Sequence, residues 1–202
     1  PTLVSGLATG AAAVTAGGEQ TCAVTTSGAA LCWGSNFSGQ LGDGTTTDRG
    51  APTAVSGLSS GVTALVAGGS HACAVVKGGA ARCWGSNEFG QLGDGSVVDR
   101  LTPTSVSGLS SGVRAMETGG GYTCALTTAG AVRCWGNNEH GQLGDGTTTD
   151  RGTAGLAIGL SSGVTAIAAG SAHACALTAG GAVRCWGDNE YGQLGNGTTI
   201  DQ

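Results

Sequence analysis

The sequence predicts an all-β protein built as a β-propeller-type array of four blades, each an antiparallel unit of four short strands. The first observation is a segment running from CWG to GQLG, whose cysteine stands at positions 32, 83, 134 and 185. Each copy lies 51 residues after the previous one, and a fixed period of this size indicates a repeat architecture. The second observation is that 41 glycines separate short runs of Ala, Val and Leu, a pattern of strands joined by glycine turns.

The second repeat shows the strands expected in one blade. They are residues 62–69 (VTALVAGG), 71–76 (HACAVV), 80–85 (AARCWG) and an outer strand at 102–106 (TPTSV). A turn centred on Gly78 places Cys73 opposite Cys83, Val75 opposite Ala81 and Ala74 opposite Arg82. Leu92 stands between glycines, as expected of a buried side chain in a tight loop.

One such unit cannot bury its faces alone, whereas stacked units can, and radial stacking gives a propeller. We therefore expect a single repeat domain over residues 1–202. Its approximate repeats are 1–50, 51–101, 102–152 and 153–202.

Composition and charge argue against two classes of partner. The chain has 8 Lys and Arg against 13 Asp and Glu, a net charge of −5, so it lacks the clustered cations that neutralise phosphates. We expect no nucleic-acid partner. No apolar run approaches the ~20 residues of a membrane span, and no polybasic segment is suited to a membrane surface.

The eight cysteines form one C-x9-C pair in each repeat: Cys22/Cys32, Cys73/Cys83, Cys124/Cys134 and Cys175/Cys185. An even number at fixed spacing favours disulfides in an oxidising compartment, hence an extracellular or cell-surface protein. Free buried thiols and a metal site are the competing interpretations. Zinc sites usually show closer cysteine spacing, and we expect no cofactor or metal.

The motif H-x-C-A-L-x-x-x-G-x-V-x-C-W-G-x-N-x-x-G-Q-L-G-x-G begins at His173 in the fourth repeat and covers essentially the whole chain in four copies. It closely resembles the repeat of the regulator of chromosome condensation family. The resemblance implies four-stranded propeller blades, and the Ala- and Gly-rich form with paired cysteines is similar to bacterial secreted members. The family's propeller usually closes with seven blades, whereas this chain has four repeats. The founding member activates a small GTPase and binds chromatin. This chain has neither a basic tail nor a wedge inserted between blades, so guanine-nucleotide exchange is not expected.

The two chain ends match the two sides of one internal junction. The C-terminus stops where Asp48 and Arg49 stand in the first repeat, and Pro1–Thr2 resumes where Pro52–Thr53 stand. Three interpretations remain open. The chain is an excerpt of a longer repeat protein, or residues 1–16 complete the last blade of the same chain, or they complete the last blade of a neighbouring chain. The third predicts head-to-tail assembly into a ring or a filament.

Two loop positions vary while the framework repeats, as expected where a scaffold presents a binding surface. Gln20, His71, Tyr122 and His173 precede the first cysteine of each repeat, and Ser38, Phe89, His140 and Tyr191 precede GQLG. The candidate partner-binding residues are Phe37, Phe89, His140, Tyr191 and Tyr122. The alternative is that these side chains cover neighbouring blades, and His71 and His173 fit structural hydrogen-bonding roles.

Three further patterns have either a structural or a functional interpretation. The pairs Asp43/Asp48, Asp94/Asp99 and Asp145/Asp150 supply too few oxygens for calcium, so we expect them to cap their own turns. Asn36 and Asn196 each begin an N-x-[ST] sequence and are possible glycosylation sites. No set of residues at catalytic spacing is apparent in the sequence, and the chain is not expected to be an enzyme.

We expect a non-enzymatic extracellular structural or scaffold protein that assembles head to tail through its terminal blades. The alternative is a protein- or glycan-binding module of a larger secreted bacterial protein. An enzyme inhibitor is a third interpretation, since the resembled family includes a proteinaceous β-lactamase inhibitor.

Overall fold

The chain folds into fifteen β-strands and no helix, which confirms the predicted all-β class; the computed structural model describes residues 1–202. The first sheet holds β1 (Ala11–Ala16), β2 (Gln20–Thr25), β3 (Ala30–Gly34) and β4 (Arg49–Ala54). The second holds β5 (Val62–Ala67), β6 (His71–Val76), β7 (Ala80–Gly85) and β8 (Arg100–Ser105). The third holds β9 (Val113–Thr118), β10 (Tyr122–Thr127), β11 (Val132–Gly136) and β12 (Arg151–Leu156). The fourth holds β13 (Val164–Ala169), β14 (His173–Thr178) and β15 (Val183–Gly187). None of the chain forms a helix of the length and apolar character that crosses a bilayer.

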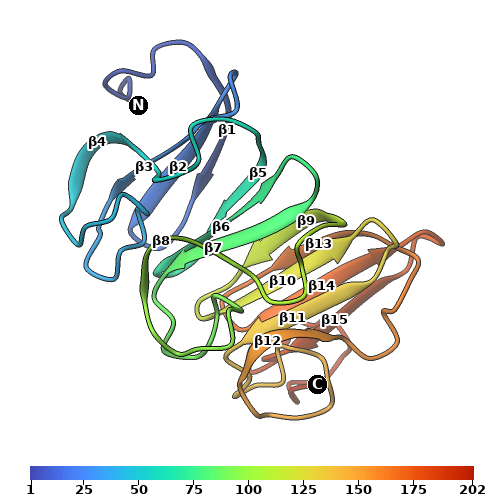
Figure 1. Ribbon diagram of the computed structural model, residues 1–202. Helices are drawn as coiled ribbons and strands as arrows, with labels where there is room; N and C mark the ends of the chain where they lie inside the picture. The colour runs from blue at the N-terminus through green and yellow to red at the C-terminus, as the bar shows by residue number, and fades with distance from the viewer.

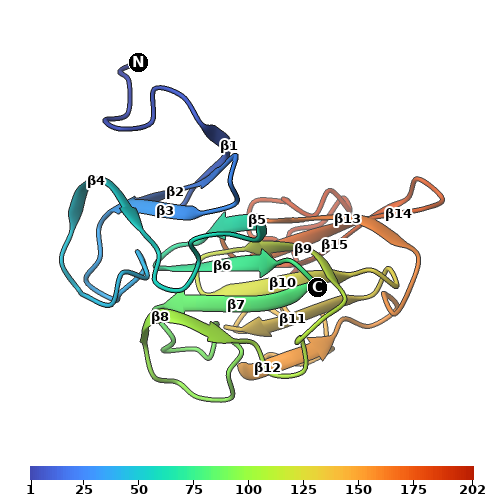
Figure 2. The same ribbon diagram turned by 45° about the horizontal axis from the view of Figure 1, so that its top comes forward.

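The four sheets follow one another in an open arc, with the N-terminus at the first sheet and the C-terminus near the fourth (Figure 1, Figure 2). Neighbouring sheets meet along β1, β5, β9 and β13, which therefore lie at the inner side of the arc. Backbone hydrogen bonds join the blades there: Gly18 N donates to Gly68 O at 3.0 Å, and Gly69 N donates to Gly119 O at 3.2 Å. A Cβ built on Gly69 would lie 2.5 Å from Gly120 O, so the close approach of the blades at their inner ends requires glycine.

The central hairpin of each blade has the predicted register. In the second blade Cys73 faces Cys83, Ala74 faces Arg82 and Val75 faces Ala81. All eight cysteines form disulfides within such hairpins, each with its two Cα atoms 4.1 Å apart: Cys22–Cys32, Cys73–Cys83, Cys124–Cys134 and Cys175–Cys185. Gly78 in the turn has a φ of 95°, a conformation that glycine adopts readily.

Removing one disulfide tests its contribution to stability. The double variant Cys73→Ala/Cys83→Ala is expected to lose about 2 kcal/mol of unfolding free energy, because the bond closes a loop shorter than the 15 residues for which about 3 kcal/mol is typical. The cysteines are 10 residues apart in sequence. Urea denaturation of the oxidised proteins measures the difference. An unchanged midpoint would mean that the hairpin register, rather than the bond, holds the two strands together.

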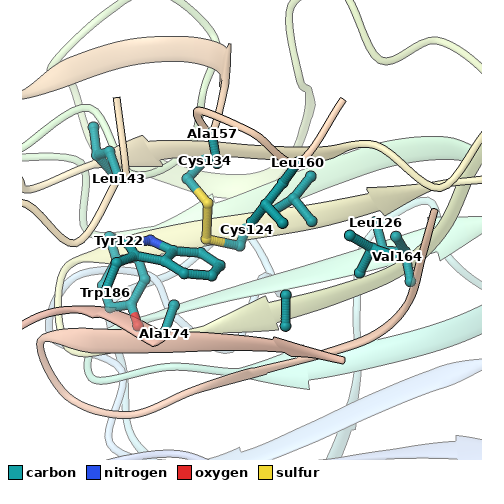
Figure 3. Packing of buried hydrophobic residues seen from close by; sticks show 12 residues of the cluster. Tyr122, Cys124, Leu126, Cys134, Leu143, Ala157, Leu160, Val164, Ala174 and Trp186 are labelled. Atoms are coloured by element: carbon teal, nitrogen blue, oxygen red, sulfur yellow. A yellow bond between two sulfur atoms is a disulfide. The ribbon is translucent and has the colours of Figure 1, made fainter. Parts of the chain in front are cut away.

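Each hydrophobic core lies between two neighbouring sheets, not within one blade. Between the third and fourth sheets, Tyr122 and the Cys124–Cys134 disulfide pack with Trp186 (Figure 3). The corresponding clusters between the other sheets contain Trp84 and Trp135. Leu92 is fully buried, as expected. Because every core needs two blades, a single blade has no core of its own, as predicted for a repeat array.

The structure corrects two details of the predicted blades. The fourth sheet has three strands, not four, and Gln202 aligns with Arg49, the first residue of β4. Gln202 pairs with Gly187. Residues 11–16, expected to help complete the last blade, form β1 and pair with β2 of the first sheet. Only residues 1–10 therefore remain outside a sheet at the N-terminal end of the arc.

Candidate functional site

In the second, third and fourth blades, the tryptophan binds a loop of the preceding blade. The indole Nε1 of Trp84 donates a hydrogen bond to the carbonyl oxygen of Gln40 at 2.9 Å. Trp135 and Trp186 make the same bond at the same length, to Gln91 and Gln142. The indole lies against the second glycine of GQLG, since a Cβ built on Gly42 would be 2.7 Å from Trp84 Nε1. The GQLG loop is therefore a docking site for the tryptophan of the next blade.

The two ends of the arc each present one half of this contact. In the first blade Trp33 is half-buried and lines an apolar groove together with Leu7 and Val14. In the fourth blade the counterpart loop, Gln193–Gly195, has no tryptophan on it, and a Cβ built on Gly195 would meet nothing within 4 Å. Val183 on β15 is 65% exposed, in contrast to its fully buried counterpart Val132 in the third blade. Both halves are thus available to a further blade.

The variable residue two positions before the first cysteine also joins neighbouring blades. Gln20 Nε2 donates to Gly68 O at 3.2 Å and to His71 O at 3.1 Å. Tyr122 donates from its hydroxyl to Gly170 O at 3.2 Å and is fully buried. The prediction of Tyr122 as a partner-binding residue is therefore wrong, because its ring fills the space between the third and fourth blades.

His71 occupies the same position in the second blade and is held in one tautomer. Thr123 Oγ1 donates to Gln91 O at 2.9 Å, so it can only accept from His71 Nε2, which lies 2.9 Å away. The proton is therefore on Nε2, and the buried Nδ1 has no hydrogen-bond partner. Burial lowers the pKa of His71 from 6.5 to about 4. Its role is structural, in agreement with the sequence-based interpretation.

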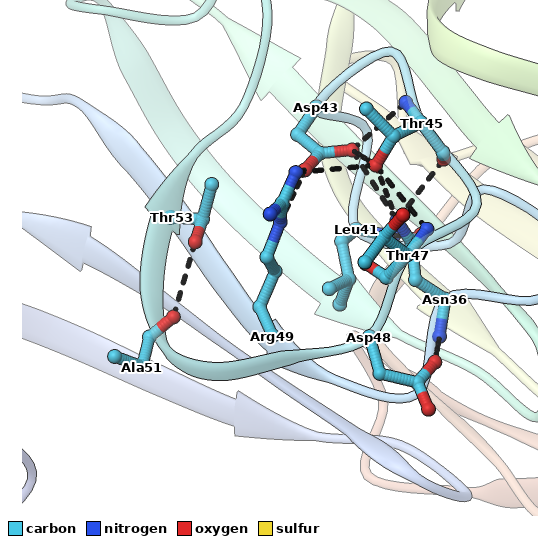
Figure 4. Close-up of polar contacts among 9 residues, drawn as sticks. All are labelled: Asn36, Leu41, Asp43, Thr45, Thr47, Asp48, Arg49, Ala51 and Thr53. Atoms are coloured by element: carbon cyan, nitrogen blue, oxygen red, sulfur yellow. Dashed lines mark hydrogen bonds and ion pairs between the residues drawn. The ribbon is translucent and has the colours of Figure 1, made fainter.

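The outer loop of each blade is closed by a buried asparagine (Figure 4). Asn36 Nδ2 donates to the carbonyl oxygens of Thr45 and Thr47, both at 3.0 Å, and its Oδ1 accepts from Leu41 N at 2.9 Å. Its own backbone N donates to Asp48 Oδ1 at 2.8 Å. Asn87, Asn138 and Asn189 make the equivalent contacts. Because Asn36 is fully buried, the prediction of Asn36 as a glycosylation site is wrong, whereas Asn196 is exposed and stays a prediction.

The loop aspartates serve the same closure. Asp43 Oδ1 accepts from the Thr45 hydroxyl at 2.7 Å, and Arg49 forms an ion pair with Asp43 Oδ2 at 2.7 Å. Burial by itself would raise the pKa of Asp43, but the bonds from Thr45 and Arg49 outweigh it and lower the pKa below its usual value. Asp94 and Asp145 have the corresponding partners Arg100 and Arg151. These oxygens are engaged by protein donors, which fits turn capping and does not fit calcium.

The remaining candidate partner-binding residues lie on the same outer loop of successive blades. Phe37 is 64% exposed and Tyr191 is 84% exposed. Phe89 and His140 are half-buried. Phe89 leans over the next blade, since a Cβ built on Gly121 would be 3.0 Å from its ring. These outer loops together form the outer rim of the array. The rim carries exposed aromatic rings on the first and fourth blades and half-buried side chains on the two blades between them.

Comparison with known proteins agrees with this geometry. The family model described as regulator of chromosome condensation (RCC1) repeat matches residues 11–40, 62–91, 113–142 and 164–193, which include every disulfide and the first two residues of every GQLG loop. The chain belongs to the RCC1 repeat family. A second model of the same description matches residues 27–75, 79–126 and 129–177.

Several members of the RCC1 repeat family are similar over most of this chain. The Ultraviolet-B receptor UVR8 of Arabidopsis thaliana is 32% identical over 200 residues, which cover 94% of this chain and 44% of UVR8. The crystal structure of human WBSCR16 matches with a TM-score of 0.84 and 27% identity, over 95% of this chain and 51% of that one. The structure of Prp20p from Saccharomyces cerevisiae, described with its binding properties to Gsp1p and histones, matches with a TM-score of 0.78 and 27% identity, over 94% and 48% of the two chains. This chain thus spans about half the length of these relatives.

Proposed function

We propose that this RCC1 repeat chain is a non-enzymatic protein-binding module that works outside the cell, and that its partner is a further copy of itself. Protein binding is supported by the relatives, of which Prp20p is described as binding Gsp1p and histones. The extracellular location is supported by the four disulfides, since such bonds persist in oxidising compartments.

Self-association is supported by two exposed surfaces, the groove that Trp33 lines in the first blade and the face around Val183 in the fourth. Inside the chain, Trp84 binds the loop of Gln40, and an equivalent contact between copies would put Trp33 of a second copy on the loop of Gln193. The contact is head to tail, so it closes into a ring or continues as a filament according to the rotation per chain.

The N-terminal segment supports the same arrangement. Residues 1–7 (PTLVSGL) differ from residues 52–58 (PTAVSGL) at one position only. Val55 and Leu58 are each 3% exposed and pack into the core between the first two sheets, whereas their counterparts Val4 and Leu7 are 38% exposed and half-buried, respectively. In a head-to-tail pair, residues 1–7 would extend along the free edge of β15 and complete the fourth sheet. Strand addition of this kind supplies main-chain hydrogen bonds to an edge that otherwise lacks them.

Light scattering coupled to size-exclusion chromatography tests this proposal on the 19.3 kDa chain. We expect a species larger than the monomer whose fraction rises with concentration. Trp33→Ala should return the protein to the monomer, whereas Phe37→Ala should leave assembly intact, because Phe37 is 64% exposed on a blade whose docking loop Trp84 already occupies. A wild-type monomer at every concentration would overturn self-association.

A second candidate function is binding of a different protein through the outer rim. It is favoured by the exposure of Phe37 and Tyr191, since aromatic side chains are common anchors of protein interfaces. The same variants separate the two functions, because partner binding through the rim would be weakened in Phe37→Ala and kept in Trp33→Ala.

A further inference from the structure

Three potential metal ligands come together where the third and fourth blades meet. They are His140 from the third blade and Asp188 and Asp201 from the fourth, and their ligating atoms all lie within 4.8 Å of one another. His140 Nδ1 and Asp201 Oδ2 are 3.0 Å apart. Two ligands bound at about 2.0 Å to one tetrahedral zinc ion are separated by about 3.3 Å, so this pair already has nearly the spacing that zinc requires.

The backbone orients both carboxylates. Asp201 Oδ1 accepts from Asn189 N at 2.8 Å, which leaves Oδ2 directed toward His140. Asp188 Oδ1 accepts from Glu190 N at 3.0 Å, so its second oxygen has no bond within the protein. Hydrogen bonds that hold ligands in this way are a usual property of metal sites.

The contact between two neighbouring blades is called a seam below. The combination of these three ligands occurs only at the seam between the third and fourth blades. Asp201 has counterparts in every repeat, because it closes the outer loop as Asp48 does in the first. His140 is replaced by serine, phenylalanine or tyrosine in the other repeats, and Asp188 by serine or asparagine. The blade fold therefore does not require a histidine at position 140 or an aspartate at position 188. That both occur at the same seam calls for a reason other than folding.

The surroundings leave room for a fourth ligand. His140 and Asp201 lie at a groove of about 560 Å³, which Glu139 and Gln202 also line. The side chains of His140 and Asp201 are 40% and 42% exposed, so water reaches them. One imidazole and two carboxylates would leave one tetrahedral position open for water, as in zinc sites that have three protein ligands. Calcium would need six to eight oxygens and does not suit an imidazole.

We propose that His140, Asp188 and Asp201 bind one Zn²⁺ ion, which links the third blade to the fourth. The ion bridges two blades that also share a hydrophobic core and the Trp186 and Tyr122 hydrogen bonds, and it adds a coordinate link at the outer side of the seam. The proposal does not depend on self-association.

Isothermal titration of the chelator-treated protein with ZnCl₂, and visible absorption with Co²⁺ as a probe, test the site. The repeats supply matched variants: His140→Phe copies Phe89, Asp188→Asn copies Asn137, and His173→Gln copies Gln20 at a histidine whose ring packs against Gly170. We expect one ion per chain and a Co²⁺ spectrum of low coordination number. The first two variants should raise the Kd about tenfold or more, and His173→Gln should leave it unchanged.

Zinc should also raise the thermal unfolding midpoint of the wild type and of His173→Gln, but not of His140→Phe. All cysteines are paired, so thiols do not compete for the ion. Two results would overturn the proposal. One is the lack of saturable binding by the wild type, and the other is equal affinity in the wild type and His140→Phe.

Discussion

Replacing Trp135 by alanine is expected to lower the free energy of unfolding by about 3–5 kcal/mol, the range for truncating a fully buried aromatic side chain. Trp135 is fully buried at the seam between the second and third blades. The change opens a cavity there and leaves the carbonyl of Gln91 without its indole donor. Since the array is stabilised by contacts between neighbours, the loss falls on one seam and should separate unfolding into two transitions, one for each pair of blades.

The matched control is Trp33→Ala, which removes the same residue type from the same position of the repeat. Trp33 is half-buried and docks on no loop within the chain, so its removal should cost much less. Urea denaturation followed by far-UV circular dichroism compares the two variants at a concentration where the chain is monomeric. Equal losses would mean that the tryptophan stabilises its own blade and not the seam.

Acidification is expected to destabilise the protein through His71. The pKa of His71 is about 4 in the folded chain against 6.5 for the free side chain. Between these values the unfolded chain binds more protons than the folded chain, so stability falls as the pH decreases. The cost is absent above pH 6.5 and complete below about pH 4. At about 1.4 kcal/mol per pKa unit it amounts to about 3 kcal/mol.

The physical reason is the buried Nδ1 of His71, which has no acceptor to receive the proton that it would gain. The variant His71→Gln copies Gln20, which donates across the first seam and does not titrate. Unfolding free energies of both proteins from pH 7.5 to 4 give the test, since all other titrations are shared and cancel. The pH dependence of the wild type should be steeper by this amount. Parallel curves would show that His71 titrates normally.

The periodic sequence made the contacts inside a blade predictable. The step of 51 residues, the glycine turns and the cysteine spacing together determine the hairpin register, so the disulfides and the buried Leu92 followed from residues close to one another in the chain. Contacts between blades were different. A repeat shows that Trp84 recurs, but it does not show that the indole binds the carbonyl of Gln40 in the preceding unit.

Variation between repeats also proved an unreliable sign of exposure. Gln20, His71 and Tyr122 differ in chemistry, yet each is buried and each makes a hydrogen bond to the next blade. A gap between blades accepts several side chains of different shape provided that each offers a donor, so variation there is compatible with a structural role. The exposure of Asn36 was also mispredicted. Its N-x-[ST] sequence does not reveal that the side chain is buried and closes the outer loop.

Each disulfide lies within one hairpin, and none joins two blades. Under mechanical load, the hairpins are therefore held by covalent crosslinks and the seams by noncovalent contacts. A pulling force applied along the chain would be resisted at the seams by hydrogen bonds and the hydrophobic cores, without a covalent crosslink between blades. Each unfolded blade would still contain a closed loop between cysteines 10 residues apart. The disulfide therefore shortens the fully extended length of each blade by about 30 Å. With its disulfides intact, the unfolded chain would therefore extend less far than after they are reduced.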